Sequence, residues 1–447
     1  MHKLILSLLL LLTALPAGAA EQQIPALWTA EEAVSYALQN SPDSSIARQR
    51  IIAAAAAMAE AESRFSPELK LSSEYAQTNN PMYSFGNILN QGKFNNNLNF
   101  NDPGRTDNLN FKIQAQYRLY NGGSDQAAVE AVQAGKTGAS ANLEAVHQQL
   151  GFEVVRLFLA IAQGQEILTA RESSLAAIRA SLAVARARYQ AGEVLKADML
   201  NLEAQEAAAD EDLIRAQNGL ELSKREFLNI LGLPAGNVAI DPRDQADQAP
   251  PGTLDSSRRP ELQVLDNAIK AAEADIRKAQ GGKRPTLDGF ASYQGDRGTV
   301  FAGSGESWMA GIRINYTFFD GDRAEAGIAA AKSRLLELKD RKVKTELALN
   351  LELQQADLAY KEAGQRLTVT QTMVTAARES ARLTRNRFQG GLILSSELIE
   401  AEKRLTDALV RQATARFMRQ AALANLRRAS GIRQFDPIAS ASQERQQ

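Results

Sequence analysis

Two segments of the chain alternate apolar and polar side chains with the period of a β-strand. In residues 111–120 one face carries Phe111, Ile113, Ala115, Tyr117 and Leu119, and the other carries Lys112, Gln114, Gln116 and Arg118. Residues 311–319 alternate in the same way, with Ile312, Ile314, Tyr316 and Phe318 on one face. Strands of about ten residues with one apolar face are typical of membrane β-barrels. A soluble sheet with one wet face has the same alternation, so the pattern alone leaves both open.

Each of these strands follows a partner strand. The partners are expected at residues 67–75 and 285–293, and the alternation is weaker in the second. The connection within the first pair, residues 76–109, is rich in Asn and Gly, which predicts a long exposed loop.

Four strands are too few to close a membrane barrel, because known single-chain bacterial barrels have eight or more. Lipid contact does not allow open sheet edges. If these strands lie in a membrane, several chains must therefore share one barrel. Two chains would give eight strands and a filled interior, and three would give twelve strands and an open lumen.

Very long helices follow the two strand pairs. The chain runs without proline from Asn121 to Gln190 and from Asp320 to Gln389, so each helix is expected to have roughly 65 residues and a length of about 100 Å. The side chains of Asn121 and Asp320 are candidates for helix caps. Glycines at 192 and 391 then predict tight turns, each followed by a second amphipathic helix, at 198–231 and 397–430.

This order of elements occurs twice. Residues 117–233 and 316–432 align without a gap, at a constant offset of 199 positions. The strand-to-helix turn at 117–122 returns at 316–321, and the Arg-aromatic-x-x-Gly turn at 188–192 returns at 387–391. A first structural repeat is therefore placed at 21–233 and a second at 261–432, with a Pro- and Asp-rich linker at 234–260 and a tail at 433–447.

The remaining composition narrows the class of protein. Residues 1–20 have a lysine near the start, an apolar stretch and small residues, the pattern of a secretory signal peptide. The chain has no cysteine, which excludes disulfides and thiolate chemistry, and a formal net charge of −1, which gives no indication of nucleic-acid binding. Its two histidines, His2 and His147, do not form a metal site, and His147 is expected at the surface. We find no pattern that indicates an enzyme or a cofactor.

Taken together, these features resemble the TolC-like outer membrane efflux proteins, also called outer membrane factors. The resemblance covers essentially the whole mature chain. It depends on the segment Leu27–Val34, on the two strand-to-helix turns, and on the two Arg-aromatic-x-x-Gly turns, each followed by an acid, Asp198 or Glu397.

The resemblance implies a mainly α-helical protein that shares a membrane β-barrel. Three chains would build a barrel of twelve strands and a long helical tunnel in the periplasm. The homotrimer would lie in the outer membrane of a Gram-negative envelope, in contact with its lipid. It would be a passive exit duct that receives substrates from an inner-membrane pump through a periplasmic adaptor protein.

The resemblance also assigns roles to the hairpin tips. The adaptor-contacting turns would be Ala191, Gly192, Glu193 and Val194 in the first repeat and Gly390, Gly391, Leu392 and Ile393 in the second. Acids at the tunnel mouth would be Glu397, Glu400 and Asp198, which would recur around the axis and favour cations. The alternative is that these carboxylates are ordinary solvated acids in the first turn of a helix.

Other functions remain open at the level of sequence. Drug efflux, metal efflux and type I protein secretion would use the same architecture. A structural coiled-coil protein of the periplasm, or an adhesin, would explain the long helices but not the paired amphipathic strands.

Overall fold

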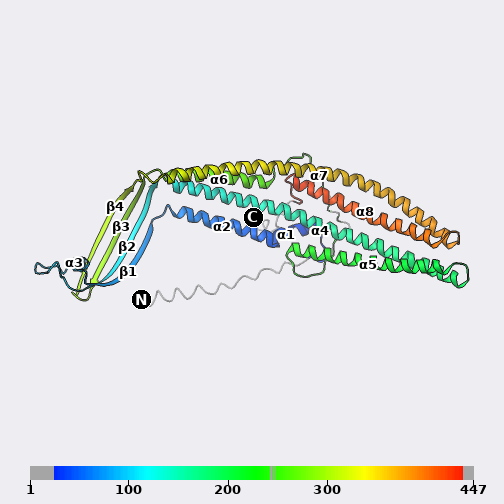
Figure 1. Cartoon of the computed structure of the whole chain (residues 1–447), viewed down its shortest axis with the longest axis horizontal. Coiled ribbons are helices and arrows are strands. Elements are labelled where there is room, and N and C mark those ends of the chain that lie inside the picture. The colour runs from blue at the N-terminus through cyan, green and yellow to red at the C-terminus, as the bar shows by residue number, and fades with distance from the viewer. Residues whose placement is uncertain (1–24, 242–243, 245, 247, 436–447) are drawn as a thin grey trace, which may run out of the picture.

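The computed structural model describes residues 25–241, 244, 246 and 248–435. The predicted signal segment and most of the predicted tail lie outside these residues. The described chain is long and narrow, with a β-sheet at one end and helices running to the other end (Figure 1). In chain order the helices and strands are α1 (Ala30–Asn40), α2 (Pro42–Ser63), β1 (Glu68–Thr78), α3 (Pro81–Asn90), β2 (Thr106–Asn121), α4 (Ser124–Gln190), α5 (Lys196–Leu231), α6 (Pro260–Gly281), β3 (Thr286–Gly298), β4 (Gly303–Asn315), α7 (Arg323–Gln389) and α8 (Ser395–Ala429).

The two long helices are present as predicted, and each has 67 residues. The expected caps contribute as well. The side chain of Asn121 accepts a hydrogen bond from the backbone N–H of Asp125 at 3.2 Å, and that of Asp320 accepts one from Ala324 at 3.0 Å. These bonds satisfy donors that the first turn of a helix leaves without a partner.

The four strands form one antiparallel sheet in the order β1-β2-β3-β4. The last strand differs from the prediction, because β4 ends at Asn315 and residues 316–319 are not part of it. Asn315 pairs with Thr286, where β3 begins directly after Pro285. Residues beyond Asn315 therefore have no strand beside them in the same chain.

The register places apolar side chains on one face of the sheet. Leu71 pairs with Ile113, Ile113 with Tyr293, and Tyr293 with Trp308, so these four exposed side chains form one row across all strands. A row on the other face consists of Ser72, Lys112, Gln294 and Ser307. We call these the apolar face and the polar face. Their separation across four strands is what a barrel wall between lipid and water requires.

The prediction of a long exposed loop at residues 76–109 is correct only in part. Both strands extend into this range, and the helix α3 lies between them. Pro81 begins the helix, and the side chain of Asn80 caps it by accepting from the N–H of Met82 at 3.1 Å. Within this helix the side chain of Ile88 is fully buried. The Asn and Gly content that suggested a loop includes this helix cap.

The helices lie side by side in one curved layer (Figure 1). The helix α7 forms one lateral edge and contacts α6 and α8, which in turn contact α4. On its other side α4 contacts α2 and α5, which form the opposite edge. The strand β4 lies at the α7 edge of the chain and β1 at the α2 edge.

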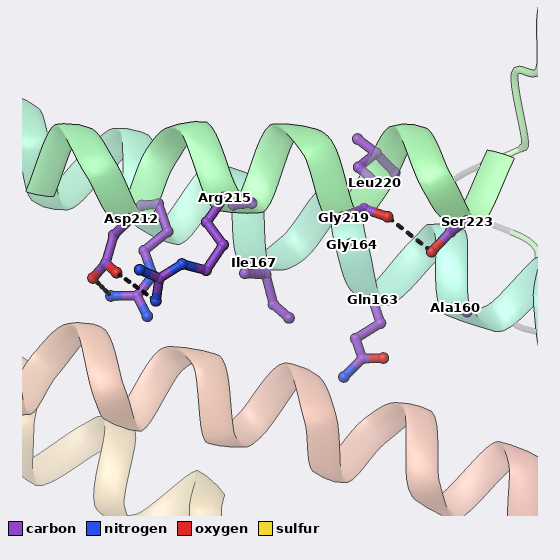
Figure 2. A pocket seen from close by; sticks show the side chains of 11 residues that line it. Ala160, Gln163, Gly164, Ile167, Asp212, Arg215, Gly219, Leu220 and Ser223 are labelled. Carbon is purple, nitrogen blue, oxygen red and sulfur yellow. Dashed lines mark hydrogen bonds and ion pairs between the residues drawn. The ribbon is translucent and has the colours of Figure 1, made fainter. Parts of the chain in front are cut away.

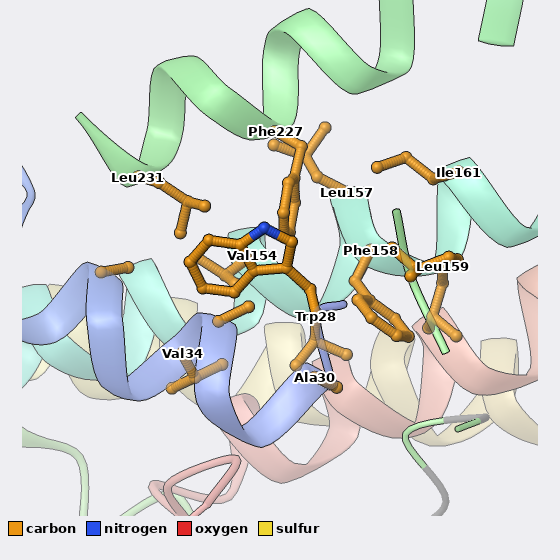
Figure 3. Close-up of a cluster of buried hydrophobic side chains, with 14 of the residues drawn as sticks. Trp28, Ala30, Val34, Val154, Leu157, Phe158, Leu159, Ile161, Phe227 and Leu231 are labelled. Carbon is orange, nitrogen blue, oxygen red and sulfur yellow. The ribbon is translucent and has the colours of Figure 1, made fainter. Parts of the chain in front are cut away.

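The main hydrophobic core lies midway along the helices. Trp28 is fully buried there against Phe158 and Phe227, with Leu231 and Val154 beside it (Figure 3). The predicted linker passes through this core. The N–H of Trp28 donates to the carbonyl of residue 239 at 2.8 Å, and the N–H of residue 241 donates to the carbonyl of Trp28 at 2.9 Å.

His147 is not the surface residue that the sequence suggested. Its ring is half-buried, and Nε2 lies 3.0 Å from Oγ of Ser44. The hydroxyl of Ser44 donates to the carbonyl of Leu38 at 2.6 Å, so the imidazole acts as the donor toward it. Burial lowers the pKa of His147, although the nearby carboxylate of Glu144 opposes that shift.

Candidate functional site at the hairpin tips

The two hairpins, α4–α5 and α7–α8, end in the same backbone turn. Gly192 and Gly391 have φ of 78° and 74°, in the left-handed region that glycine adopts without strain. In the first turn the N–H of Glu193 donates to the carbonyl of Arg188 at 2.9 Å. In the second the N–H of Leu392 donates to Arg387 at the same distance. This helix-ending motif is why the repeated glycines predicted the reversal of the chain correctly.

An arginine joins the two tips. Arg188, in the last turn of α4, donates from Nη1 to the carbonyl oxygen of Phe388 at 3.2 Å, in the last turn of α7. Its Nε donates to Glu193 at 3.1 Å. The guanidinium lies over Gly391, where a Cβ atom would come within 2.9 Å of its central carbon. A larger residue at position 391 would therefore displace this side chain.

A carboxylate joins them at a second point. Asp198, in the first turn of α5, accepts from the hydroxyl of Ser395 at 2.6 Å and from the backbone N–H of Ser395 at 3.3 Å. Ser395 is the first residue of α8 and is only 1% exposed. The side chain of Asp198 therefore satisfies an otherwise unpaired donor at the start of a helix in the other hairpin.

A small hydrophobic cluster lies behind these contacts. Its buried members come from all four helices and are Leu182, Ala185, Leu202, Phe388 and Leu398. Val184, Met199, Ile393 and Ile399 pack against it. The cluster and the two polar contacts hold the hairpins of one chain together at their ends.

An ion pair within each hairpin repeats with the sequence. Arg186 contacts Glu203 at 3.0 Å, and the equivalent Arg385 contacts Glu402 at 2.7 Å. The first pair is partly exposed, whereas Glu402 is buried. The same pair therefore lies in different surroundings in the two repeats.

The acids proposed for the tunnel mouth fall into two kinds. Glu397 and Glu400 are exposed, and the nearest cation to Glu400 is Arg404, at 3.8 Å. Asp198, in contrast, is half-buried and bound to Ser395. The structure thus brings Asp198 to the junction of the hairpins and leaves the two glutamates at the surface.

The residues proposed to contact an adaptor lie at the extreme tips. Ala191, Gly192, Glu193, Gly390, Gly391 and Leu392 are exposed, whereas Val194 and Ile393 are half-buried. The sequence analysis missed two exposed leucines, Leu195 and Leu394, which precede α5 and α8 at equivalent positions of the repeat. Their identical place in the two repeats was the signal that could have identified them. It also missed Arg188 and Ser395 as contacts between the hairpins.

Grooves run between the helices above the tips. One of about 310 Å³ lies between α4 and α5, with Gly164 packed against Leu220 and an ion pair between Arg171 and Asp212 at 2.8 Å (Figure 2). Across the described chain no group of three metal-ligating side chains comes together. Nor is any described helix both long and apolar enough to cross a bilayer.

The order of strands, long helices and helical hairpins defines a class of outer-membrane channel folds. Solved structures share it at low sequence identity. VceC from Vibrio cholerae superposes with a TM-score of 0.73 at 18% identity, over 91% of this chain and 97% of that one. The open-state MtrE channel from Neisseria gonorrhoeae gives 0.72 at 17% identity, over 90% and 89%.

The family model for outer membrane efflux proteins matches residues 33–233 and 256–432, and the chain belongs to that family. BepC, an outer membrane efflux protein of Brucella suis, is 22% identical over 65% of this chain and 62% of its own length. The toluene efflux pump outer membrane protein TtgC of Pseudomonas putida is 25% identical over 45% of this chain and 43% of its own length. The matched part is thus less than two thirds of each of these relatives.

Proposed function

We propose that this chain is the outer-membrane channel of a tripartite export system. It would be a passive duct that receives substrates from an inner-membrane pump through a periplasmic adaptor. The observation that carries the proposal is that neither the sheet nor the helical layer of one chain closes on itself. Its sheet has two open edges, β1 and β4, and its helical layer has two lateral edges, α7 on one side and α2 with α5 on the other.

The α7 edge carries an exposed apolar stripe. Leu336, Leu347, Leu358 and Val369 are spaced eleven residues apart and are between 59% and 67% exposed. An eleven-residue repeat keeps one stripe on one side of a helix that is nearly straight or slightly right-handed in its supercoil. A stripe of this length on a water-soluble surface indicates an interface. We call it the α7 stripe.

The opposite edge also presents exposed apolar side chains. These are Ile46 and Ile52 on α2, and Ile214 and Leu222 on α5. If β4 of one copy pairs with β1 of the next, α7 comes to lie against α2 and α5 of that next copy. The same rotational symmetry between copies then closes the sheets into a barrel and the helical layers into a tunnel. Three copies give a barrel of twelve strands with an open lumen, which supports a homotrimer.

The tips are the proposed place of opening and of contact with the adaptor. Asp198 and Arg188 hold the two hairpins together, so separating them would widen the end of the tunnel. Glu397 and Glu400 are the exposed carboxylates next to that junction, and a ring of them would attract cations. Replacing both by Gln is expected to lower the preference of the channel for cations over anions.

The names of the relatives BepC and TtgC support efflux as the process. The test is to express the full-length chain with its predicted signal, isolate the protein from the outer membrane and reconstitute it in planar bilayers. A detergent-stable trimer that forms ion-conducting channels is expected, together with greater sensitivity to toxic compounds when the gene is deleted. A native chain that is monomeric and soluble without detergent would instead support a periplasmic spacer.

A further inference from the structure

The segment around α3 lies at the end of the sheet farthest from the long helices, and part of it projects beyond the sheet (Figure 1). It consists of residues 79–105, which connect β1 to β2 and include α3, and we call it the outer segment. The helix α3 contacts β2, β3 and β4, so the outer segment crosses the sheet from β1 toward the open edge at β4.

Three glycines show on which face of the sheet it lies. Gly305 pairs with Asp296, which pairs with Asn110, and Asn110 belongs to the polar face together with Lys112. Gly303 is two residues from Gly305, so it points to the same face, and its partner Gly298 does too.

A Cβ atom on any of these three glycines would collide with the outer segment. At Gly303 it would lie 2.6 Å from the carbonyl oxygen of Gln91 and 2.7 Å from the side chain of Lys93. At Gly305 it would meet the backbone of Asn90, and at Gly298 the side chain of Gln91. The chain from Asn90 to Lys93 therefore rests directly on the polar face, in the space that the missing side chains leave.

Hydrogen bonds fix the outer segment in this position. The amide of Gln91, itself 1% exposed, donates to the carbonyl of Asp107 at 2.7 Å and to Asn108 at 3.0 Å. The amide of Asn87 donates to Thr106 at 3.0 Å. Because this buried glutamine donates to two acceptors at the start of β2, it fixes the outer segment to the sheet.

The neighbouring β3–β4 turn is bound to the same place. The carboxylate of Asp107 accepts from the hydroxyl of Thr299 at 2.6 Å and from the N–H of Val300 at 2.7 Å. Within the outer segment, Phe85 packs with Phe94 and Phe100 at ring distances of 5.9 and 4.8 Å. Both connections at this end of the sheet are therefore joined into one packed unit.

We propose that the outer segment is a constriction at the outer exit of the channel, which limits the size of solutes that pass. This inference rests on the proposed function, because only a closed barrel turns the polar face into the wall of a lumen. Each copy in the ring then places one outer segment inside the barrel mouth. The resting position on the polar face excludes the alternative that the segment lies against lipid.

The experiment uses the absence of cysteine in the chain. A single Gln114→Cys substitution places a thiol on the polar face, inward of the outer segment. Intact cells are then treated from outside with a small membrane-impermeant maleimide or with a large polyethylene-glycol maleimide. We expect the small reagent to label this cysteine and the large one to fail.

The decisive variant removes the obstruction. Because Thr78 and Thr106 pair directly, residues 79–105 can be replaced by a two-residue Asn-Gly turn that continues the hairpin. Labelling by the large reagent is expected to rise from background to the level of the small one. Equal labelling by the large reagent with and without the outer segment would overturn the constriction.

Two point substitutions test the same proposal in case the deletion of residues 79–105 prevents folding. Gly303→Ala adds a methyl group beneath the outer segment, whereas Gly295→Ala adds one to the apolar face, where nothing lies within 4 Å. Gly303→Ala should admit the large reagent and Gly295→Ala should not. If neither variant changes labelling, the constriction is refuted. If the small reagent does not label the Gln114→Cys variant, while an Asn97→Cys variant at an exposed position is labelled, the proposed open barrel itself fails.

Discussion

The hydroxyl of Ser395 lies 2.6 Å from the carboxylate of Asp198, although the two residues belong to different hairpins. In the repeat Asp198 corresponds to Glu397, and Ser395 corresponds to Lys196. The repeat therefore relates the contact between Asp198 and Ser395 to a second pair of residues, the acid Glu397 and the base Lys196. Within a single chain Glu397 is exposed.

The first prediction concerns the junction of the hairpins. Asp198→Ala removes a charged acceptor, and such hydrogen bonds are worth about 2 kcal/mol each. The tips should separate more often, so single-channel conductance in planar bilayers should increase. Glu203→Gln is the matched control, because it removes a carboxylate that acts only within one hairpin. An unchanged conductance in Asp198→Ala would show that this contact does not hold the tunnel closed.

The second prediction follows from the repeat. In a ring, the α5 end of one copy meets the α7 end of the next in the way that α8 meets α4 within a chain. Glu397 should then lie beside Lys196 of the neighbouring copy, so that Glu400 supplies the larger share of the cation attraction proposed for the tunnel mouth. Lys196→Glu alone places like charges together and should raise conductance. The double exchange Lys196→Glu with Glu397→Lys should restore the original value, and failure of that rescue would contradict the pairing.

The third prediction tests the α7 stripe. Leu347→Glu places a charge in the middle of the proposed interface, where burial of a leucine contributes about 2 kcal/mol. The side chain is 67% exposed in the single chain, so the substitution should leave folding intact and abolish the trimer in size-exclusion chromatography with light scattering. Ala348→Glu, about 100° around the same helix, is the control and should remain trimeric. A trimeric Leu347→Glu variant would locate the interface elsewhere.

The fourth prediction concerns pH. Burial holds the pKa of His147 below its usual value of 6.5, so the unfolded chain binds a proton more readily than the folded chain. The stability contributed by the neutral imidazole is complete above pH 6.5 and is lost as the pH falls below it. Arg48 and Arg433 also face this ring and disfavour its protonation, whereas Glu144 favours it. Thermal unfolding midpoints measured between pH 8 and pH 5 should fall less steeply in His147→Gln than in the unaltered protein.

The strands show which features of the sheet can be predicted from local sequence. Alternation correctly assigned Ile113 to the apolar face, because side chains of a strand must point to opposite sides in turn. It extended the last strand to residue 319, since alternation does not reveal where the neighbouring strand begins. It also missed α3, which lies against β2, β3 and β4 and in which Ile88 is fully buried.

By itself the sequence determined the long helices, the hairpin turns at Gly192 and Gly391, and the incomplete sheet. Each of these depends on residues close together in the chain or on an internal repeat that aligns without a gap. Tertiary structure decided which of two equivalent residues in the repeats makes a contact within the chain. Asp198 binds Ser395 while its counterpart Glu397 remains exposed, because only one side of each hairpin has a neighbour within the same chain. It also decided that residues 79–105 lie on the polar face, since that position depends on three glycines about 200 residues further along the chain.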